Sequence, residues 1–388
     1  MARLGDLFLH IRNGANIKQG LDNTGYPITR IETISNRVVN REKMGYAGIT
    51  DVNKYPDFVL QDGDILMSHI NSEIHLGKAA LYEKEDDEII IHGMNLLLLR
   101  PNKDLITSKY AFYYLSSQSF LRQIPNITKK SVNQASFTVS ALKELAFPIP
   151  SIEEQKKITL DLDKVNDLIS LRKQQLSKLD ELVKSRFIEL FGDPMTNSNG
   201  YVLKKYGDLF ELNAGGTPSK QKSEYWDNGT ISWIGSNMCQ NTVIYENDGN
   251  YITEEGLKHS SARMFPVDTV LIALVGATIG KTALLKFETT TNQNVLGVRG
   301  IRESGYTPEF IFHYTQGLYQ KFLNIGDGGF AMASKGFISE LPVPVVDLAL
   351  QEQFAAFVEQ TDKSKIEIQQ SLEKLETLKK ALMQKYFR

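Results

Sequence analysis

The second half of this chain repeats the first, and this repeat constrains the fold more than any other feature of the sequence. Five short segments recur in the same order, with a period of about 200 residues. They are Gly5-Asp6-Leu7-Phe8 and Gly207-Asp208-Leu209-Phe210; Gly77-Lys78-Ala79 and Gly280-Lys281-Thr282; Asn95-Leu96-Leu97 and Asn294-Val295-Leu296; Tyr110 to Tyr114 and Phe310 to Tyr314; Pro148-Ile149-Pro150 and Pro342-Val343-Pro344. This period is too long for a solenoid repeat, so the repeating unit is a whole domain plus a connector.

Each half ends in a segment with the apolar spacing of a coiled coil. Apolar residues recur in alternating steps of four and three from Ile158 to Leu190 and from Phe354 to Tyr386. The seam includes Ile158, Leu162, Val165, Ile169, Leu176, Leu179, Val358, Ile368, Leu372 and Leu375. Two such helices in one chain are expected to pair with each other, although the heptads alone leave parallel and antiparallel pairing open. The alternative is that each helix belongs to a separate bundle.

The remainder of each half has the pattern of mixed α and β structure. Short apolar runs bounded by turn formers predict buried strands at 89–91, 96–99, 147–149 and 270–275. Aromatic-rich segments at 109–121 and 308–323 predict helices. The expected class is α+β, with two similar domains and two long helices. The predicted boundaries are 1–150, 151–194, 195–346 and 347–388.

Composition excludes several classes of protein. Apolar residues make up 41% of the chain and charged residues 23%, which are globular values. The longest apolar run, near 269–277, is too short to cross a bilayer, and the first residues lack the pattern of a secretory signal. A single cysteine, Cys239, allows neither an internal disulfide nor a multi-cysteine zinc site. We therefore expect a soluble, cytoplasmic protein.

No segment of the sequence makes a convincing catalytic motif. Gly276-Ala277-Thr278-Ile279-Gly280-Lys281-Thr282 resembles a phosphate-binding loop, but its glycines are spaced one residue too closely, and a turn between two strands explains it better. The nearest candidates for nuclease carboxylates, Asp57 and Glu154, are far apart in the sequence. The six histidines show no metal-ligand spacing. We expect no bound cofactor, no metal and no chemistry of the chain's own.

Polar loops at matching places in the two halves are the candidate functional residues. Lysine side chains hold phosphates, whereas asparagine and glutamine can read base edges. The net charge is −2, so any affinity for DNA must come from local groups or from a partner. The candidate DNA-binding residues are Asn13, Asn16, Lys18, Lys129, Lys130, Asn133, Gln134, Thr217, Ser219, Lys220, Lys222, Ser334 and Lys335.

The whole chain resembles the specificity subunit of a type I restriction-modification enzyme. The resemblance rests on the two-fold order of domain, proline segment and long helix. The motifs that carry it are Gly-Asp-Leu-Phe at both domain starts, Gly215-Gly216-Thr217-Pro218-Ser219, Ala277 to Thr282, Phe147 to Gln155 and Leu190-Phe191-Gly192-Asp193-Pro194. The second proline segment departs from the pattern, because Val345 to Leu350 lengthen the stretch before Gln351.

The resemblance implies a non-catalytic DNA reader. Each domain would be a target recognition domain for one half of a bipartite site, and the helices would form an antiparallel spacer. The same helices, with their seam residues, would dock two modification subunits, which bind S-adenosylmethionine and methylate adenine. Restriction subunits would join this complex. The main alternative is a coiled-coil scaffold with no role on nucleic acid, and a nucleotide-dependent enzyme using Lys281 is a weaker one.

Overall fold

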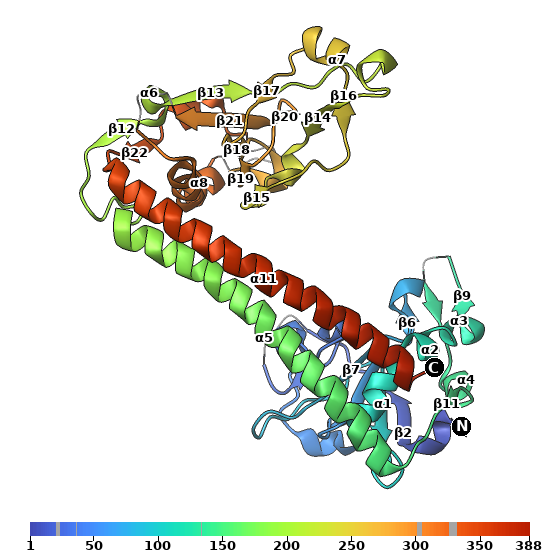
Figure 1. Ribbon diagram of the computed structural model, residues 1–388. Coiled ribbons are helices and arrows are strands. Elements are labelled where there is room, and N and C mark those ends of the chain that lie inside the picture. Colours follow the sequence, from blue (N-terminus) through green and yellow to red (C-terminus); the bar gives the residue numbers. More distant parts are fainter. Residues whose placement is uncertain (21–23, 36, 133, 301–304, 326–331) are drawn as a thin grey trace. The chain divides into compact units, whose positions relative to one another are not determined.

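The computed structural model describes residues 1–388 except 21–23, 36, 133, 301–304 and 326–331. The chain divides into two compact units, which we call unit 1 (1–173 with 370–388) and unit 2 (174–369). Helices α5 (Ile152–Phe191) and α11 (Leu348–Tyr386) each contribute one part to each unit (Figure 1). The mixed helix and strand content confirms the α+β class, and both predicted long helices are present.

Unit 1 is built around an antiparallel sheet in the order β2-β8-β5-β7. Its strands are β2 (Phe8–Asn13), β8 (Leu96–Pro101), β5 (Ile65–Ser68) and β7 (Ala79–Leu81). Small sheets join β1 (Ala2–Arg3) to β11 (Ala146–Phe147), β3 (Pro27–Ile28) to β4 (Gly45–Tyr46), and β6 (Ile70–Asn71) to β10 (Ala135–Ser136) and β9 (Lys129–Lys130). The short helices are α1 (Ser108–Leu115), α2 (Gln118–Leu121), α3 (Ile124–Ile127) and α4 (Val139–Lys143).

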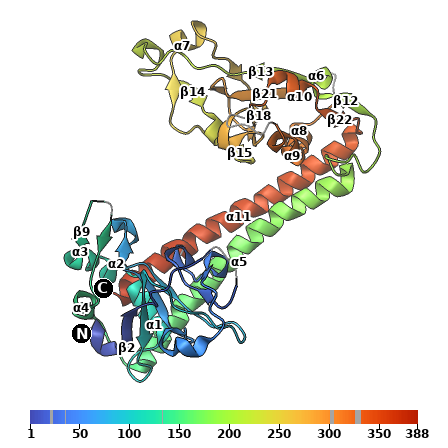
Figure 2. The same ribbon diagram turned by 180° about the vertical axis from the view of Figure 1, so that it is seen from behind.

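Unit 2 repeats this order and adds strands to it. Its main sheet runs β13-β21-β18-β19-β15, with strands β13 (Phe210–Ala214), β21 (Val295–Gly300), β18 (Val270–Ala273), β19 (Thr282–Leu285) and β15 (Thr242–Ile244). A second sheet contains β16 (Tyr251–Ile252), β14 (Ile231–Ile234), β20 (Thr289–Thr291) and β17 (Met264–Phe265), and β12 (Leu203–Lys205) pairs with β22 (Pro342–Pro344). The short helices are α6 (Tyr206–Leu209), α7 (Glu254–Lys258), α8 (Pro308–Gly317), α9 (Tyr319–Leu323) and α10 (Lys335–Ser339), several of which are labelled in Figure 2.

Successive side chains along a strand point to opposite faces of the sheet, so each unit has one apolar cluster on each face of its main sheet. In unit 1, Ile65 and Met67 of β5 pack with α1 and α5, whereas Leu66 packs in a separate cluster with Tyr82. In unit 2, Val270 and Ile272 of β18 likewise face the helices. Their neighbours Leu271 and Ala273 face the second sheet.

The end of a long helix closes the core of each unit. In unit 1, the ring of Phe387, just after α11, lies 5.5 Å from the ring of Tyr110 and is 1% exposed. In unit 2, Phe191, the last residue of α5, occupies the corresponding place, 4.9 Å from Phe310. Because each unit is closed by the C-terminal end of one helix and holds the N-terminal part of the other, the two helices run antiparallel within each unit.

The helix seam supplies the packing between the two helices. Ion pairs border it, from Lys173 to Glu376 at 3.5 Å in unit 1 and from Lys365 to Asp180 at 2.7 Å in unit 2. The seam side chains that are buried are Ile158, Leu162, Val165, Ile169, Val358 and Leu372, and those that are half-buried are Leu176, Leu179, Ile368 and Leu375. Since they pack inside the chain, contact with a partner would fall mainly to side chains on the outer helix faces.

The repeat extends to hydrogen bonds that attach the helices to the domains. Gln155, fully buried, accepts from the Thr107 N–H and donates to the carbonyls of Leu105 and Pro150. Gln351, equally buried, accepts from the Thr307 N–H and donates to the carbonyls of Gly305 and Val346. A buried glutamine side chain therefore attaches the start of each long helix to its unit, and we call this arrangement the amide clamp. The longer stretch at 345–350 leaves the clamp of α11 intact.

Five strand and helix predictions need correction. Residues 89–91 are not a strand: Ile91 makes only isolated bridges to Ile28 and Val59, although it is buried. The strand predicted at 147–149 ends at Phe147, because Pro148 has no N–H to donate. The predicted helix 109–121 is two helices, since the Ser117 hydroxyl caps a new one by accepting from the Phe120 N–H. The predicted helix 308–323 is likewise two helices, α8 and α9, and the strand predicted at 270–275 ends at Ala273.

The glycine-rich segment at 276–282 is the predicted turn. A 3-10 turn at Gly276–Thr278 connects β18 to β19, which pair antiparallel. A phosphate-binding loop would instead lead into a helix. None of the described helices has an apolar stretch long enough to cross a membrane.

Candidate nucleic-acid interface

The first predicted loop of unit 1 leaves the end of β2. Asn13 is the last residue of that strand and pairs with Leu97 of β8. A Cβ atom on Gly14 would collide with the Gly93 carbonyl oxygen, so this close approach requires glycine. The Ala15 N–H donates to the His92 carbonyl at 2.8 Å, and the side chains of Asn13, Asn16 and Lys18 are exposed.

A side-chain pair holds the far end of this loop. Arg30 donates from Nε to Gln19 Oε1 at 2.7 Å, and Gln19 donates from Nε2 to the Thr29 carbonyl at 3.2 Å. The loop is therefore anchored at both ends, with its polar side chains facing solvent. Neither Gln19 nor Arg30 was among the predicted site residues.

The second predicted segment of unit 1 is a hairpin formed by β9 and β10. Lys129 and Lys130 are exposed, and Lys130 Nζ lies 2.6 Å from Glu73 Oε1. Ser131 donates from both its N–H and its hydroxyl to the Gln134 carbonyl, each at 2.8 Å. The side chain of Gln134 is exposed, and Asn133 lies outside the described residues.

Strand register brings the loop and the hairpin to the same end of the sheet. Asn13 pairs with Leu97, which pairs with Met67, one residue before the end of β5. The chain continues from β5 into β6, which pairs with β10 of the hairpin. The predicted DNA-binding residues of unit 1 that the structure describes thus belong to segments at one end of the sheet.

The corresponding loop of unit 2 begins at the end of β13. The Asn213 Oδ1 atom accepts from Arg263 Nη1 at 2.7 Å, and the Asn213 Nδ2 atom donates to Glu211. A Cβ atom on Gly215 would collide with Thr291, as at the matching position in unit 1. The Thr217 hydroxyl donates to Gln293 Oε1, so Thr217 is held against the neighbouring segment.

The tip of this loop presents cations and a hydroxyl group. Ser219, Lys220 and Lys222 are exposed. Lys222 donates to the Tyr225 hydroxyl at 2.8 Å, and this hydrogen bond raises the pKa of Lys222. Arg263 and Gln293, which the sequence analysis missed, join the candidate residues through their contacts with Asn213 and Thr217.

Two tryptophans fix the backbone of the same loop. Trp226 donates from Nε1 to the Ser219 carbonyl, and Trp233 donates from Nε1 to the Gly216 carbonyl, both at 3.1 Å. Their rings meet edge to face, with centroids 5.3 Å apart and planes at 80°. The rarity of tryptophan in this sequence, with both copies close after the glycine-rich motif, was a signal that could have identified them.

The last predicted segment of unit 2 lies before α10. The Ser334 hydroxyl accepts from the Phe337 N–H at 3.1 Å and so caps α10, as Thr138 caps α4 in unit 1. The cap explains why a hydroxyl stands at both places, and a DNA contact by Ser334 remains a prediction. Lys335 is exposed, whereas residues 326–331 of this loop lie outside the described part of the chain.

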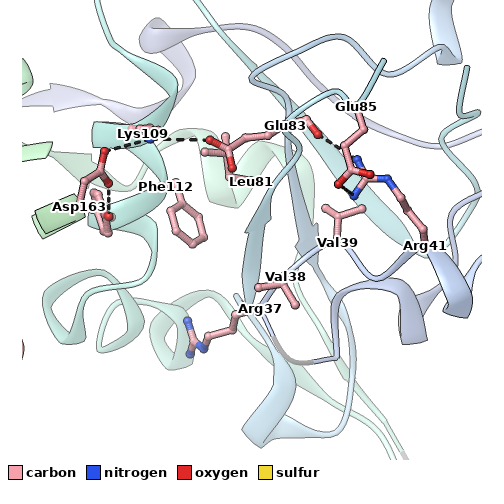
Figure 3. A pocket seen from close by; sticks show the side chains of 11 residues that line it. Arg37, Val38, Val39, Arg41, Leu81, Glu83, Glu85, Lys109, Phe112 and Asp163 are labelled. Carbon is pink, nitrogen blue, oxygen red and sulfur yellow. Dashed lines mark hydrogen bonds and ion pairs between the residues drawn. The ribbon is translucent and has the colours of Figure 1, made fainter. Parts of the chain in front are cut away.

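A cavity of about 290 Å³ lies elsewhere in unit 1, between α1, α5 and residues 37–41 (Figure 3). Most of its charges are paired: Lys109 Nζ lies 2.9 Å from Asp163, and Arg41 binds Glu85 at 2.9 Å. The hydrogen bond from Arg41 also lowers the pKa of the neighbouring Glu88 to about 2. The cavity contains none of the predicted site residues, and its ion pairs leave no free acid–base couple for catalysis.

Two histidines of unit 1 whose pKa values are lowered lie in its core. Burial lowers the pKa of His69 to about 4 and of His92 to about 3, so both rings are neutral near pH 7. His92 Nδ1 lies 3.3 Å from the Thr29 hydroxyl. Over the described residues, no group of three or more histidine, cysteine or acidic side chains is arranged to hold a metal.

Comparison with known proteins agrees with this architecture. The sequence matches the type I restriction modification DNA specificity domain twice, over residues 1–181 and 199–380. The chain therefore belongs to the family of type I restriction-modification specificity subunits, which are non-catalytic and recognise DNA in sequence-specific fashion. The resemblance noted from the motifs is confirmed.

One relative matches nearly the whole chain, and another matches about half of it. A putative type I restriction enzyme specificity subunit of Methanocaldococcus jannaschii is 30% identical over 98% of this chain and 90% of its own length. A type I specificity subunit of Escherichia coli is 29% identical over 55% of this chain and 51% of its own length.

Solved structures show the same fold. The type I S subunit from M. genitalium covers 100% of this chain and 95% of its own, with a TM-score of 0.58 and 15% identity. A chain from a study of complex assembly and conformational transition of the type I restriction-modification system covers 100% of this chain and 97% of its own. Its TM-score is 0.60 at 16% identity.

Proposed function

We propose that each unit reads one half of a bipartite DNA site. The observation that carries this proposal is a repeated scaffold with different side chains on matching loops. The loop after β2 offers Asn13, Asn16 and Lys18, whereas the matching loop after β13 offers Ser219 and Lys220 and is held by tryptophan. Because different donors and acceptors match different base edges, the two half-sites are expected to differ in sequence.

The long helices would act as the spacer between the half-sites and as the dock for two modification subunits. Their antiparallel pairing within each unit supports the first role. Exposed leucines on the outer side of α5 support the second: Leu160, Leu168 and Leu171 are 53%, 43% and 48% exposed. Their spacing places them on one face of the helix, away from the seam.

The proposed partners supply what this chain lacks. The modification subunits would bind S-adenosylmethionine and methylate adenine, and restriction subunits would complete the assembly in the cytoplasm. The net charge of −2 supports a shared interface, in which partners hold many of the phosphates.

The test is to reconstitute the chain with the modification subunits of its own system and to sequence the methylated sites. We expect a bipartite motif. Inserting one heptad between Leu171 and Gln175, with a matching heptad near Ile368, adds about 10.5 Å to each helix. It should lengthen the gap by about three base pairs and leave both half-sites unchanged. An unchanged gap with altered half-sites would contradict the spacer.

A further inference from the structure

The two tryptophans of this chain both donate hydrogen bonds to the backbone of the loop that follows β13. Trp226 follows a 3-10 turn at Ser223–Tyr225, and Trp233 lies on β14, so the two indoles reach the loop from separate elements. Each indole N–H donates to a different loop carbonyl, of Ser219 and of Gly216. Both rings are half-buried and support each other edge to face.

This bracing acts on a part of the loop that no strand ladder fixes. The Gly216 N–H donates to the Thr291 carbonyl at 2.8 Å, and after it the chain leaves the sheet. Pro218 is buried, whereas Ser219 and Lys220 point their side chains into solvent. An unbraced loop would lose about 1–2 kcal/mol of conformational entropy per residue on being ordered by a ligand. A loop that is already fixed avoids this cost at the moment of binding.

We infer that Trp226 and Trp233 are positioning residues for DNA recognition by unit 2, an inference that rests on the proposed function. They set the backbone between Gly216 and Ser219 so that Ser219 and Lys220 meet DNA without rearrangement. The tryptophans themselves need not touch DNA. Lys220 would contact a phosphate group, and the Ser219 hydroxyl a base edge.

Unit 1 gives a natural contrast. Its matching loop is held by Arg30 and Gln19, an amide–guanidinium pair rather than two aromatic rings. Variants of the tryptophans should therefore affect only the half-site read by unit 2. A loss of general stability would not discriminate between half-sites in this way.

The experiment uses the full chain reconstituted with its modification subunits. Trp226→Phe and Trp233→Phe each remove one indole donor and keep an aromatic ring. Each should weaken binding to the cognate duplex by about three- to tenfold, in line with one hydrogen bond. Methylated-site sequencing should show relaxed bases in one half-site, and the salt dependence of binding should stay unchanged because no phosphate contact is removed.

Tyr306→Phe is the matched control. It removes one hydrogen bond of unit 2, from the Tyr306 hydroxyl to the Pro344 carbonyl at 2.8 Å, beside α11 rather than the loop. It should leave the methylated motif intact. An unchanged motif in both tryptophan variants, or the same relaxation in Tyr306→Phe, would overturn the inference.

A second measurement does not depend on the variants folding. Incorporating 5-fluorotryptophan into this chain alone gives one ¹⁹F resonance per indole. Before DNA is added, both resonances should already be dispersed from the random-coil position, because both indoles are held against the loop. A random-coil position for either resonance would overturn the inference. Failure of the wild-type complex to bind DNA at all would instead contradict the proposed function.

Discussion

The two units agree closely where they meet the long helices and differ where they present polar loops. In the first turn of each long helix, Gln155 and Gln351 make matching sets of three hydrogen bonds. Arg30 holds the loop after β2 in unit 1, whereas two tryptophans hold the matching loop after β13 in unit 2. One scaffold is therefore kept in both units, while the polar side chains of the loops and the groups that hold those loops differ.

The agreement includes aromatic side chains beside the proline segments. The Tyr110 hydroxyl donates to the Pro148 carbonyl at 3.2 Å, and the Tyr306 hydroxyl donates to the Pro344 carbonyl. These hydrogen bonds are part-buried, so the fold supplies the partners of the two hydroxyl groups. A loop residue at the sheet edge faces no such requirement.

The largest expected effect comes from breaking the shared clamp. Gln351→Leu leaves the Thr307 N–H and two carbonyl groups without their partner, which should cost about 3 kcal/mol of unfolding free energy. Hydrogen exchange measured by mass spectrometry should show faster exchange around 305–351. Gln155→Leu should do the same around 105–155.

Gln353→Leu is the control, because Gln353 is exposed on the same helix. It should change the unfolding free energy by less than about 0.5 kcal/mol. Equal effects of Gln351→Leu and Gln353→Leu would show that the clamp has no special importance.

The next effect concerns the readout of unit 1. If Gln134 is bidentate to a base, Gln134→Ala should cost about 1–3 kcal/mol of discrimination and relax one half-site. Sequencing of methylated sites is the measurement. Relaxation of the half-site that depends on 213–222 would refute the assignment of one unit to one half-site.

A smaller effect concerns a histidine in the core of unit 2. His313 packs 5.3 Å from Phe354, and burial lowers its pKa to about 3, with Lys365 contributing. The unfolded chain takes up a proton as the pH falls through about 6.5, whereas the folded unit does not until near pH 3. Unit 2 should therefore lose stability over this window, by about 1 kcal/mol per pH unit from His313.

His313→Phe should remove this part of the acid sensitivity. The measurement is denaturation of both proteins at pH 7 and pH 5. If the free energy of unfolding falls by the same amount in wild type and in the variant between these pH values, His313 is protonated in the folded state.

The smallest effect concerns phosphate contacts. Lys129→Ala, if Lys129 holds a phosphate, should weaken binding to all sequences alike and reduce the salt slope by about one. Titrations of a cognate and a random duplex at several salt concentrations measure it. A change confined to the cognate duplex would assign Lys129 to base recognition instead.

The repeat and the long helices could be predicted because they depend on patterns within the chain. Apolar residues at alternating steps of four and three determine a helix whatever its partner, and glycines such as Gly14 and Gly215 mark the same close approach twice. Antiparallel pairing could not be derived from the heptads. It depends on Phe191 and Phe387 entering separate cores, which is a tertiary contact.

The site was only partly predictable for a similar reason. Exposed lysines and amides on glycine-rich loops can be selected by residue type, as for Lys129, Gln134 and Lys220. Arg30, which holds the loop of unit 1, carries no local signature, whereas Trp226 and Trp233 could have been noticed because they are the only tryptophans of the sequence and follow the glycine-rich motif closely. Ser334 was selected by residue type as a DNA contact, and the structure gives its hydroxyl a local role as well, because it caps α10.

Residues 370–388 belong to the same compact unit as residues 1–173, and this has a consequence for synthesis on the ribosome. The aromatic core around Tyr110 emerges early but stays open until Phe387 has been translated. Unit 2 has all its residues by position 369, so it can close first. A nascent chain must therefore keep the apolar groups of its earlier half from aggregating while the later half folds. Cleavage before residue 370 would expose them again.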